Sequence, residues 1–349
     1  MKIGIDVSPL ESGHKVRGVG FYLEHLKNGL LAHFPDNEYV FFTQQEKLQE
    51  AVDVVHYPYF DPFFRTLPLK KKYPQVVTVH DLTPLVFPSH FPAGVRGKLT
   101  WQLQKHNLQK SDRIIADSEA SKKDIIRLAG IAENKIDVIY LAAAEEFKKI
   151  STLNSQLSIR DKYSLPENFV LYVGDVTWNK NLPRLLRAIK EINLTLVMVG
   201  KSLAQKDFDR SNPWNKDLVE VNQLAEDDKR IIKLGFVPTE DLVAIYNSAT
   251  VFVMPSLYEG FGLPILEAMQ SGCPVVTTKG GSLPEVAGEA AYYVDHSDIN
   301  SIANGIGEVF FSDKLQRELC EKGLVQAKKF SWKRTAEETI EVYRRVIKL

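Results

Sequence analysis

The stretch YEGFGLPILEAMQSG, residues 258–272, decides the fold of this chain. It follows an apolar run, residues 249–254, that is typical of a buried parallel strand. Its glycines predict a loop and then a helix, with Pro264 suited to the first helical position and Glu267 within the first turn. Gly272 ends that helix. This order places backbone amides and the positive end of a helix dipole at the carboxyl edge of a sheet, where they can bind an anion.

Two carboxylates, Glu259 and Glu267, bracket this anion-binding turn. Each one alone is explained simply as a solvated glutamate, with Glu267 favoured by the helix dipole. Together they could hold hydroxyl groups while the amides hold phosphate, and such a site fits a nucleotide sugar. The whole pattern, Glu259-x-Phe261-Gly262 with Glu267 five residues further on, resembles the signature of the retaining, Leloir-type glycosyltransferases of family four, which have the GT-B fold.

The resemblance implies two Rossmann-like, doubly wound α/β domains that face each other across a cleft, with the C-terminal helix crossing back onto the N-terminal domain. It also implies that Glu259 contacts the transferred sugar and that Glu267 binds the ribose hydroxyls. Phe261, Gly262 and Leu263 would lie against the donor diphosphate. The family retains anomeric configuration by a route that is disputed, so we assign Glu259 to catalysis without giving it the role of a nucleophile.

The composition limits the class of protein. The chain has 349 residues, which is enough for two domains with a core each. Its 44 basic and 44 acidic side chains balance, which argues against a nucleic-acid partner. Its two cysteines have no metal-ligand spacing and fit a reducing compartment. The chain begins with a strand pattern rather than a signal peptide, and no apolar run approaches the roughly 20 residues that span a bilayer. We therefore expect a cytoplasmic protein.

The first half alternates strands and helices, which predicts a parallel, doubly wound sheet. Residues 3–7 form the first strand, followed by a loop with Gly18 and Gly20 and then a helix from residue 21. A dinucleotide fingerprint is the alternative explanation of these glycines, but its third glycine position holds Leu23. In the family that the chain resembles, such a glycine pair lies near the donor diphosphate and the acceptor, with Arg17 here as a nearby cation.

His80 directly follows an apolar strand at residues 75–79. A histidine chosen blindly is more often structural than catalytic. However, the carboxyl ends of strands are where open α/β sheets bind ligands, and Asp81 comes next. The resemblance implies that His80 lines the reaction centre and contacts the donor sugar.

The linker between the domains is placed at residues 141–166, because the strand–helix pattern is lost there and polar residues increase. The predicted N-terminal, acceptor-side domain is residues 1–160, joined by a returning helix at residues 333–349. The predicted C-terminal domain, residues 166–330, binds the nucleotide-sugar donor.

In the donor domain, a strand at residues 168–173 leads through a glycine-bearing loop to a helix from residue 182, with Lys180 at its head. Lys180 could be a solvated lysine, but a cation at a helix N-terminus adds full charge to a phosphate site. The family commonly has two cations in this loop, whereas this chain has Asp175 and Asn179 at the candidate positions for the other. The candidates for the missing charge are Arg184, Lys201 and Arg17.

Two further loops are assigned by the resemblance. Lys201 follows a strand at residues 194–199 and would lie near the donor phosphates or nucleoside, and the backbone around Val237 would meet the base. Asp207 and Asp209 match Asp-x-Asp, which holds a metal on the nucleotide in the other common transferase fold. They lie in a charged insertion with no strand before it. We therefore expect a solvated loop, with no metal and no cofactor.

The sequence thus predicts a retaining transferase that moves a hexose from a nucleotide-diphosphate sugar to a hydroxyl acceptor. The expected acceptor is a growing glycan or glycolipid of a cell-surface polysaccharide, and a lipid-linked one would bring the protein to the inner face of the cell membrane. A nucleotide-sugar epimerase or phosphorylase on the same scaffold is one alternative. A non-catalytic partner subunit is another, because Asp175 and Asn179 stand where cations are expected. The sequence specifies neither the nucleotide nor the sugar.

Overall fold

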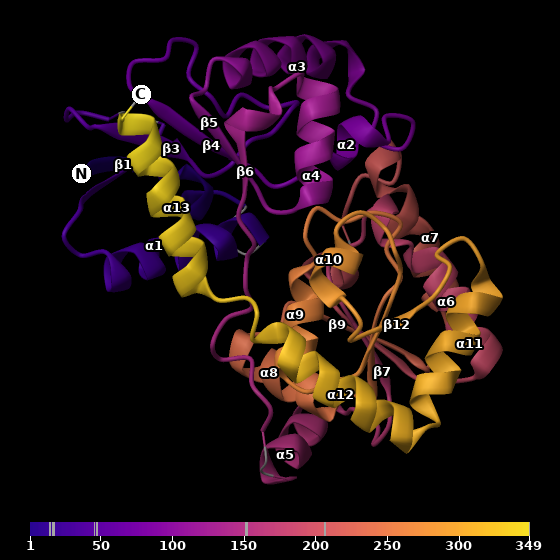
Figure 1. Ribbon diagram of the computed structural model, residues 1–349. Helices are drawn as coiled ribbons and strands as arrows, with labels where there is room; N and C mark the ends of the chain where they lie inside the picture. The colour runs from indigo at the N-terminus through magenta and orange to yellow at the C-terminus, as the bar shows by residue number, and fades with distance from the viewer. Residues whose placement is uncertain are drawn as a thin grey trace. The chain divides into compact units, whose positions relative to one another are not determined.

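The computed structural model describes residues 1–13, 15, 18–44, 46, 48–150, 153–205 and 207–348. The chain forms two compact units (Figure 1). Unit 1 comprises Met1–Ala142 together with Phe330–Leu349, and unit 2 is the intervening segment, Ala143–Lys329. Among the described residues, no helix combines the length and the apolar character needed to cross a membrane.

Unit 1 is built on a six-stranded sheet in the order β2-β1-β3-β4-β5-β6, and every neighbouring pair of strands is parallel. The central strand β4 is buried along its whole length, as expected for a strand that is covered on both faces. The strands of unit 1 are β1 (Lys2–Asp6), β2 (Glu38–Phe42), β3 (Val54–Tyr57), β4 (Gln75–Val79), β5 (Arg113–Ala116) and β6 (Ile136–Val138).

The helices of unit 1 include one contributed by the C-terminal segment, and it packs beside α1 (Figure 1). This helix, α13, stacks Trp332 on His25 of α1 with ring centroids 5.0 Å apart. The expectation of a returning C-terminal helix is confirmed. The helices of unit 1 are η1 (Ser8–Glu11), α1 (Gly18–His33), α2 (Thr83–Val86), α3 (Gly94–Gln109), α4 (Glu119–Asp124), η2 (Ile125–Ala129), η3 (Glu133–Lys135) and α13 (Trp332–Ile347).

Unit 2 is built on a second six-stranded sheet in the order β12-β11-β10-β7-β8-β9, again with parallel neighbours throughout. Strands β7, β8 and β10 are buried at every position, which explains why their sequences are continuous apolar runs. The strands of unit 2 are β7 (Val170–Val173), β8 (Leu196–Val199), β9 (Ile231–Gly235), β10 (Val251–Met254), β11 (Val275–Thr277) and β12 (Tyr292–Tyr293).

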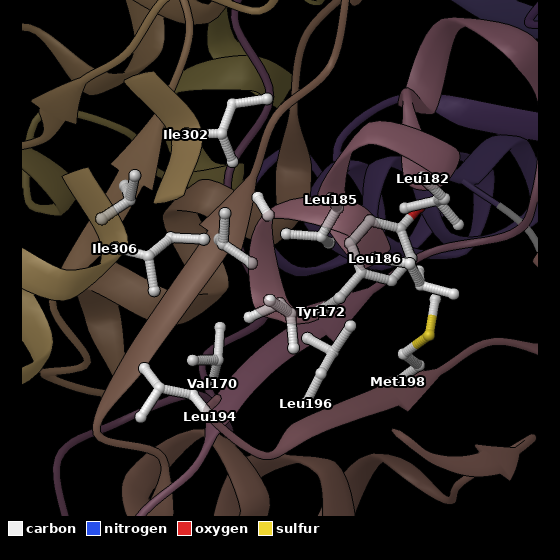
Figure 2. Close-up of a cluster of buried hydrophobic side chains, with 14 of the residues drawn as sticks. Val170, Tyr172, Leu182, Leu185, Leu186, Leu194, Leu196, Met198, Ile302 and Ile306 are labelled. Carbon is white, nitrogen blue, oxygen red and sulfur yellow. The ribbon is translucent and has the colours of Figure 1, made fainter. Parts of the chain in front are cut away.

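A large hydrophobic core of unit 2 lies between its sheet and the helices α6, α7 and α11. In α6, apolar residues recur at Leu182, Leu185, Leu186 and Ile189, and this spacing places them on one face. Figure 2 shows this face with side chains of β7, β8 and α11. The helices of unit 2 are α5 (Leu153–Tyr163), η4 (Trp178–Lys180), α6 (Leu182–Ile192), η5 (Lys201–Ala204), η6 (Pro213–Asn215), α7 (Lys216–Ala225), α8 (Thr239–Ser248), α9 (Leu263–Gln270), α10 (Leu283–Ala287), α11 (Ile299–Phe310) and α12 (Asp313–Ala327).

The division between the units differs from the predicted one. Residues 143–160, assigned from the sequence to the first domain, belong to unit 2, because the helix α5 packs against α8. Asn247 of α8 also bonds the segment before α5, accepting from the amide of Ile150 at 2.7 Å. At the other boundary, Phe330 belongs to unit 1 rather than to the donor domain.

In each sheet, successive strands are first added on one side and then on the other, and the change occurs at one pair of neighbouring strands. In unit 1 this pair is β1 and β3, and in unit 2 it is β7 and β10. Loops that leave the carboxyl ends of such a pair run to opposite faces of the sheet and leave a crevice in which α/β proteins bind ligands. In unit 2 these loops carry Lys180 and Glu259, so the fold brings together two residues that are 79 positions apart.

Candidate functional site

Hydrogen bonds tie the two loops of the unit 2 crevice to each other. The amide of Leu257 donates to the carbonyl oxygen of Asn179 at 2.7 Å, and the Asn179 side-chain amide donates to the carbonyl oxygen of Tyr258 at 2.9 Å. Asn181, in the left-handed region with φ of 60°, donates from its side chain to the carbonyl oxygens of Pro255 and His296. The loop after β7 therefore holds the turn before Glu259 in place.

A third loop, after β11, supports Glu259 from behind. Gly281 has φ of +62°, and a Cβ atom there would lie 2.3 Å from the carbonyl oxygen of Glu259. This position therefore requires glycine on both conformational and steric grounds. The Ser282 hydroxyl lies 3.0 Å from the carbonyl oxygen of Glu259 and 2.7 Å from that of Phe261. These contacts fix the backbone on both sides of the glycine turn.

The turn leads into α9 through Gly262, whose φ of +104° allows the chain to enter the helix sharply. The helix begins at Leu263, with Pro264 at its second position. Glu267 is therefore in the second turn, and the prediction that it lies in the first turn is wrong. Its place is not explained by the helix dipole, which acts on the first turn alone.

Lys180 and Glu259 form an ion pair. The Lys180 Nζ lies 2.8 Å from both carboxylate oxygens of Glu259, and the two side chains are 20% and 9% exposed. Sequence reasoning gave these residues separate tasks, phosphate binding and sugar contact. The structure shows that they lie together at the head of α6. A phosphate that approaches Lys180 would thus also approach Glu259, whose charge the lysine balances.

Asp175 and Asn179, at the two positions where a second cation was expected, make hydrogen bonds that stabilise the loops. Asp175 Oδ1 accepts from both the backbone amide and the hydroxyl of Ser202, each at 3.1 Å, and so joins the loops after β7 and β8. Asn179 is buried and bonds the Tyr258 carbonyl, as described above. Of the proposed substitutes, Arg184 donates to the side-chain oxygen of Asn181 at 2.8 Å. Lys201 is exposed at the start of η5, and Arg17 lies outside the described residues.

Glu267 is buried and has a partner that sequence reasoning missed. The Tyr246 hydroxyl donates to its Oε2 at 2.9 Å. Burial raises the pKa of Glu267 to about 7, and the bond from Tyr246 acts in the opposite direction. The loop after β9, where the donor base was expected, buries Val237 and exposes 63% of Phe236.

In unit 1, Gly18 and Gly20 lie in the first turn of α1, which begins at Gly18. The sequence predicted them in a loop with the helix starting at residue 21, so that boundary is wrong. Binding of an anion at the first turn of this helix stays a prediction.

His80 lies at the carboxyl end of β4, as predicted, and both of its ring nitrogens face acceptors. Nδ1 is 2.7 Å from Asp117 Oδ2, and Nε2 is 3.1 Å from the carbonyl oxygen of Pro58. Burial lowers the pKa of His80, but Asp117, with smaller contributions from Asp81 and the Pro58 carbonyl, raises it, and the net pKa is above its ordinary value. The ring is therefore held in one orientation, and its Nε2 hydrogen is directed along the bond to Pro58.

A chain of buried hydrogen bonds runs from α13 to Tyr22, whose ring contacts His80. The Tyr343 hydroxyl of α13 is 2.7 Å from His56 Nδ1, and His56 Nε2 is 2.8 Å from the Thr78 hydroxyl. That hydroxyl lies 3.0 Å from the hydroxyl of Tyr22, whose ring meets His80 edge-on at 4.7 Å. Burial lowers the pKa of His56 to about 3, so this histidine is neutral and structural.

The Asp-x-Asp match lies in irregular chain between η5 and η6, as predicted. Asp209 uses its Oδ1 to accept from the amide and the hydroxyl of Ser211, at 2.9 and 2.6 Å. In the part of the chain that the structure describes, no group of three or more His, Cys, Asp or Glu side chains is arranged to hold a metal.

Comparisons with known proteins agree with these features. A family profile described as "Glycosyl transferases group 1" matches residues 155–325, and one described as "Glycosyltransferase Family 4" matches residues 12–144. O-antigen chain mannosyltransferase B of Escherichia coli is 34% identical over 77% of this chain and 70% of that protein. Serotype-specific mannosyltransferase WbdA of Escherichia coli is 32% identical over 78% of this chain, which spans only 33% of WbdA. The structure of Anabaena Alr3699/HepE in complex with UDP-glucose aligns with 99% of this chain and 100% of its own, at a TM-score of 0.73 and 19% identity.

Proposed function

Because this chain belongs to the group 1 glycosyltransferases and has the GT-B fold, we propose that it moves a hexose from a nucleotide-diphosphate sugar to a hydroxyl of a growing glycan, with retention of configuration. Mannose is the first candidate sugar, since the E. coli relatives with similarity over most of this chain are named as mannosyltransferases. One of them is named for O-antigen chain synthesis, which suggests a cell-surface polysaccharide as the product.

The observation that carries this proposal is the ion pair of Lys180 and Glu259 on the two crevice loops, with the buried Glu267 on α9, the helix that the second loop enters. In the proposed complex, the amides of Phe261, Gly262 and Leu263 bind the diphosphate, and the dipole of α9 favours its charge. Glu267 accepts from the ribose hydroxyls, and Glu259 contacts the transferred sugar.

The same groups act on the reaction itself. Cleavage of the bond between sugar and phosphate puts negative charge on the leaving diphosphate and positive charge on the anomeric carbon. Amides and a lysine that are already in place stabilise the first without reorganisation. Since Lys180 also contacts Glu259 at 2.8 Å, it holds that carboxylate in place beside the positive charge that develops on the sugar. We propose that this arrangement works without a metal.

In the proposed complex, one lysine and backbone amides bind the diphosphate in place of the usual two cations. Asp175 and Asn179 serve the loops rather than the ligand, so Lys180 and the helix amides take the larger share of diphosphate binding. Lys201, exposed on the neighbouring loop, and Val237 on the next loop are proposed to meet the phosphates and the base respectively.

Unit 1 supplies the residues proposed for the acceptor and the sugar. Gly18 and Gly20 offer the backbone amides of the first turn of α1, and His80 offers an oriented imidazole at the end of β4. A lipid-linked acceptor would add peripheral contact with a membrane. Co-sedimentation with vesicles that carry the acceptor lipid measures that contact directly.

The test is a thermal-shift panel of UDP-, GDP-, ADP- and dTDP-sugars, followed by titration of the sugar that stabilises the protein. Glu267→Ala should weaken the binding of that sugar by at least tenfold, because a buried acceptor of two hydroxyls is lost. Glu240→Ala, at an exposed position in the first turn of α8, is the matched control and should bind normally. Donor affinity and turnover that survive Glu267→Ala would refute the assignment of the site.

A non-catalytic partner subunit is the second candidate, because Asp175 and Asn179 stand where cations are expected. It predicts unchanged thermal stability with every sugar of the panel. An epimerase or phosphorylase would instead convert the donor without a glycan acceptor, which product analysis in the absence of acceptor distinguishes.

A further inference from the structure

Tyr246 and Glu267 meet in the interior of unit 2. The tyrosine comes from α8 and the glutamate from α9, and both side chains are buried. The tyrosine hydroxyl donates to Glu267 Oε2 at 2.9 Å, and its only other acceptor in the described structure, the carbonyl oxygen of Pro264, is at 3.5 Å. The hydroxyl proton is therefore committed to the carboxylate.

Two aromatic neighbours fix the tyrosine ring. Phe147 meets it edge-on with ring centroids 5.7 Å apart, and Phe252 of β10 lies at 5.6 Å. Edge and tilted contacts of this kind favour one ring orientation. The direction of the hydroxyl is thus set by packing and not by the glutamate alone.

Phe147 is itself held by polar contacts on either side. Gln270 of α9 donates to the carbonyl oxygen of Ala144 at 3.1 Å. Asn247, the neighbour of Tyr246 in α8, donates to the carbonyl oxygen of Lys148 at 2.9 Å. The segment of residues 143–150 is therefore anchored to the two helices that carry the tyrosine and the glutamate.

We propose that Tyr246 is a positioning residue for donor binding: it fixes the Glu267 carboxylate through Oε2 and leaves Oε1 to accept from the ribose of the nucleotide sugar. The inference rests on the proposed function, in which Glu267 binds the ribose. A carboxylate that is held by one oxygen loses little rotational freedom when the ligand arrives, and this lowers the cost of binding.

The bond from Tyr246 also favours the ionised carboxylate. Burial raises the pKa of Glu267 to about 7, and the tyrosine bond lowers it. The ionisable groups on the elements packed around this pair include Tyr172 of β7, Cys273 after α9, Cys320 of α12 and Glu285 of α10. They also include Asp241 of α8, with Lys162 and Tyr163 of the α5 helix that packs on it. The Lys149 Nζ donates to Cys320 Sγ at 3.6 Å. Among the described residues, Tyr246 is the hydrogen-bond donor to this carboxylate.

Donor binding should depend on pH through Glu267. A carboxylate acceptor is fully available above its pKa, so donor affinity in the natural protein should fall as the pH drops through about 7. Without the tyrosine bond the pKa rises further, so affinity should already fall at a higher pH.

The experiment compares Tyr246→Phe with Tyr163→Phe. Tyr163 makes the same kind of bond: its hydroxyl lies 2.7 Å from Oδ2 of Asp241, a carboxylate of α8 that also pairs with Lys162 of α5. Tyr246→Phe should raise the donor dissociation constant about tenfold and leave kcat within about threefold, and it should move the acid limb of donor affinity to higher pH. Tyr163→Phe should change neither.

The possible outcomes separate the two proposals. If Glu267→Ala leaves donor affinity intact, the proposed site is wrong. If Glu267→Ala abolishes binding while Tyr246→Phe binds normally with an unshifted acid limb, the site stands and the role of Tyr246 is refuted. Equal losses in Tyr246→Phe and Tyr163→Phe, with no shift in pH dependence, would show a general structural effect and would also refute it.

Discussion

The ion pair between Lys180 and Glu259 predicts a measurable coupling in stability. Lys180→Met removes the cation that both carboxylate oxygens contact at 2.8 Å, while keeping most of the apolar stem of the side chain. Removal of one partner from a fully buried pair costs about 3–5 kcal/mol. Here the lysine side chain is 20% exposed, so water replaces part of the interaction. We expect a loss of about 2–3 kcal/mol.

The pair is best tested by a double-mutant cycle. Glu259→Gln removes the charge and keeps the shape, and the double variant Lys180→Met/Glu259→Gln should be more stable than the sum of the single losses implies, by about 1–2 kcal/mol. Urea unfolding read by hydrogen-exchange mass spectrometry on peptides from β7 and β10 reports on unit 2 separately from unit 1.

An exposed pair in the same unit serves as the control. Lys162 lies 2.7 Å from Asp241, but its side chain is 56% exposed, so Lys162→Met should cost less than about 1 kcal/mol. If the losses of Lys180→Met and Glu259→Gln add without coupling, or if Lys180→Met is no more destabilising than Lys162→Met, the pair does not hold the two loops together and the reasoning fails.

The remaining predictions concern three other places. Asp117→Asn removes the charge that raises the pKa of His80, so burial should then bring it below its ordinary value in an NMR titration of the ring; an unchanged titration would contradict the pairing. Gly281→Ala should destabilise unit 2 by about 2–4 kcal/mol in urea, because the new Cβ would lie 2.3 Å from the Glu259 carbonyl oxygen at a φ of +62°. A variant of natural stability would show that the turn is not packed as described. Asp209→Asn should retain full turnover, with EDTA or without it, whereas a loss would assign this carboxylate a metal or a substrate.

The sequence predicted the strands and the site loops because both have strong local signals. Buried strands such as β4 and β7 are continuous apolar runs, and the loops that follow them carry glycine. The GT-B fold and the family are confirmed by comparison with known proteins. The roles of individual site residues stay predictions.

The errors arose where local signals conflict with packing. Glycine is a poor helix former, so the pattern placed the start of α1 after Gly20, although the helix includes both glycines. The helix α5 is polar over most of its length and was assigned to a linker, because its contact with α8 cannot be read from composition. The bond from Tyr246 to Glu267 joins residues 21 positions apart on two helices, and only their tertiary packing creates it.

The path of the chain through unit 1 has a consequence for its synthesis. Unit 1 is interrupted by Ala143–Lys329, so a ribosome completes all of unit 2 before it produces α13. Until then His56 has no Tyr343 to bond, and the surface of α1 that receives Trp332 is uncovered. The nascent first unit should therefore remain a substrate for chaperones while the second unit already folds, and damage to α13 should reduce the yield of folded protein more than a substitution at the surface of unit 2.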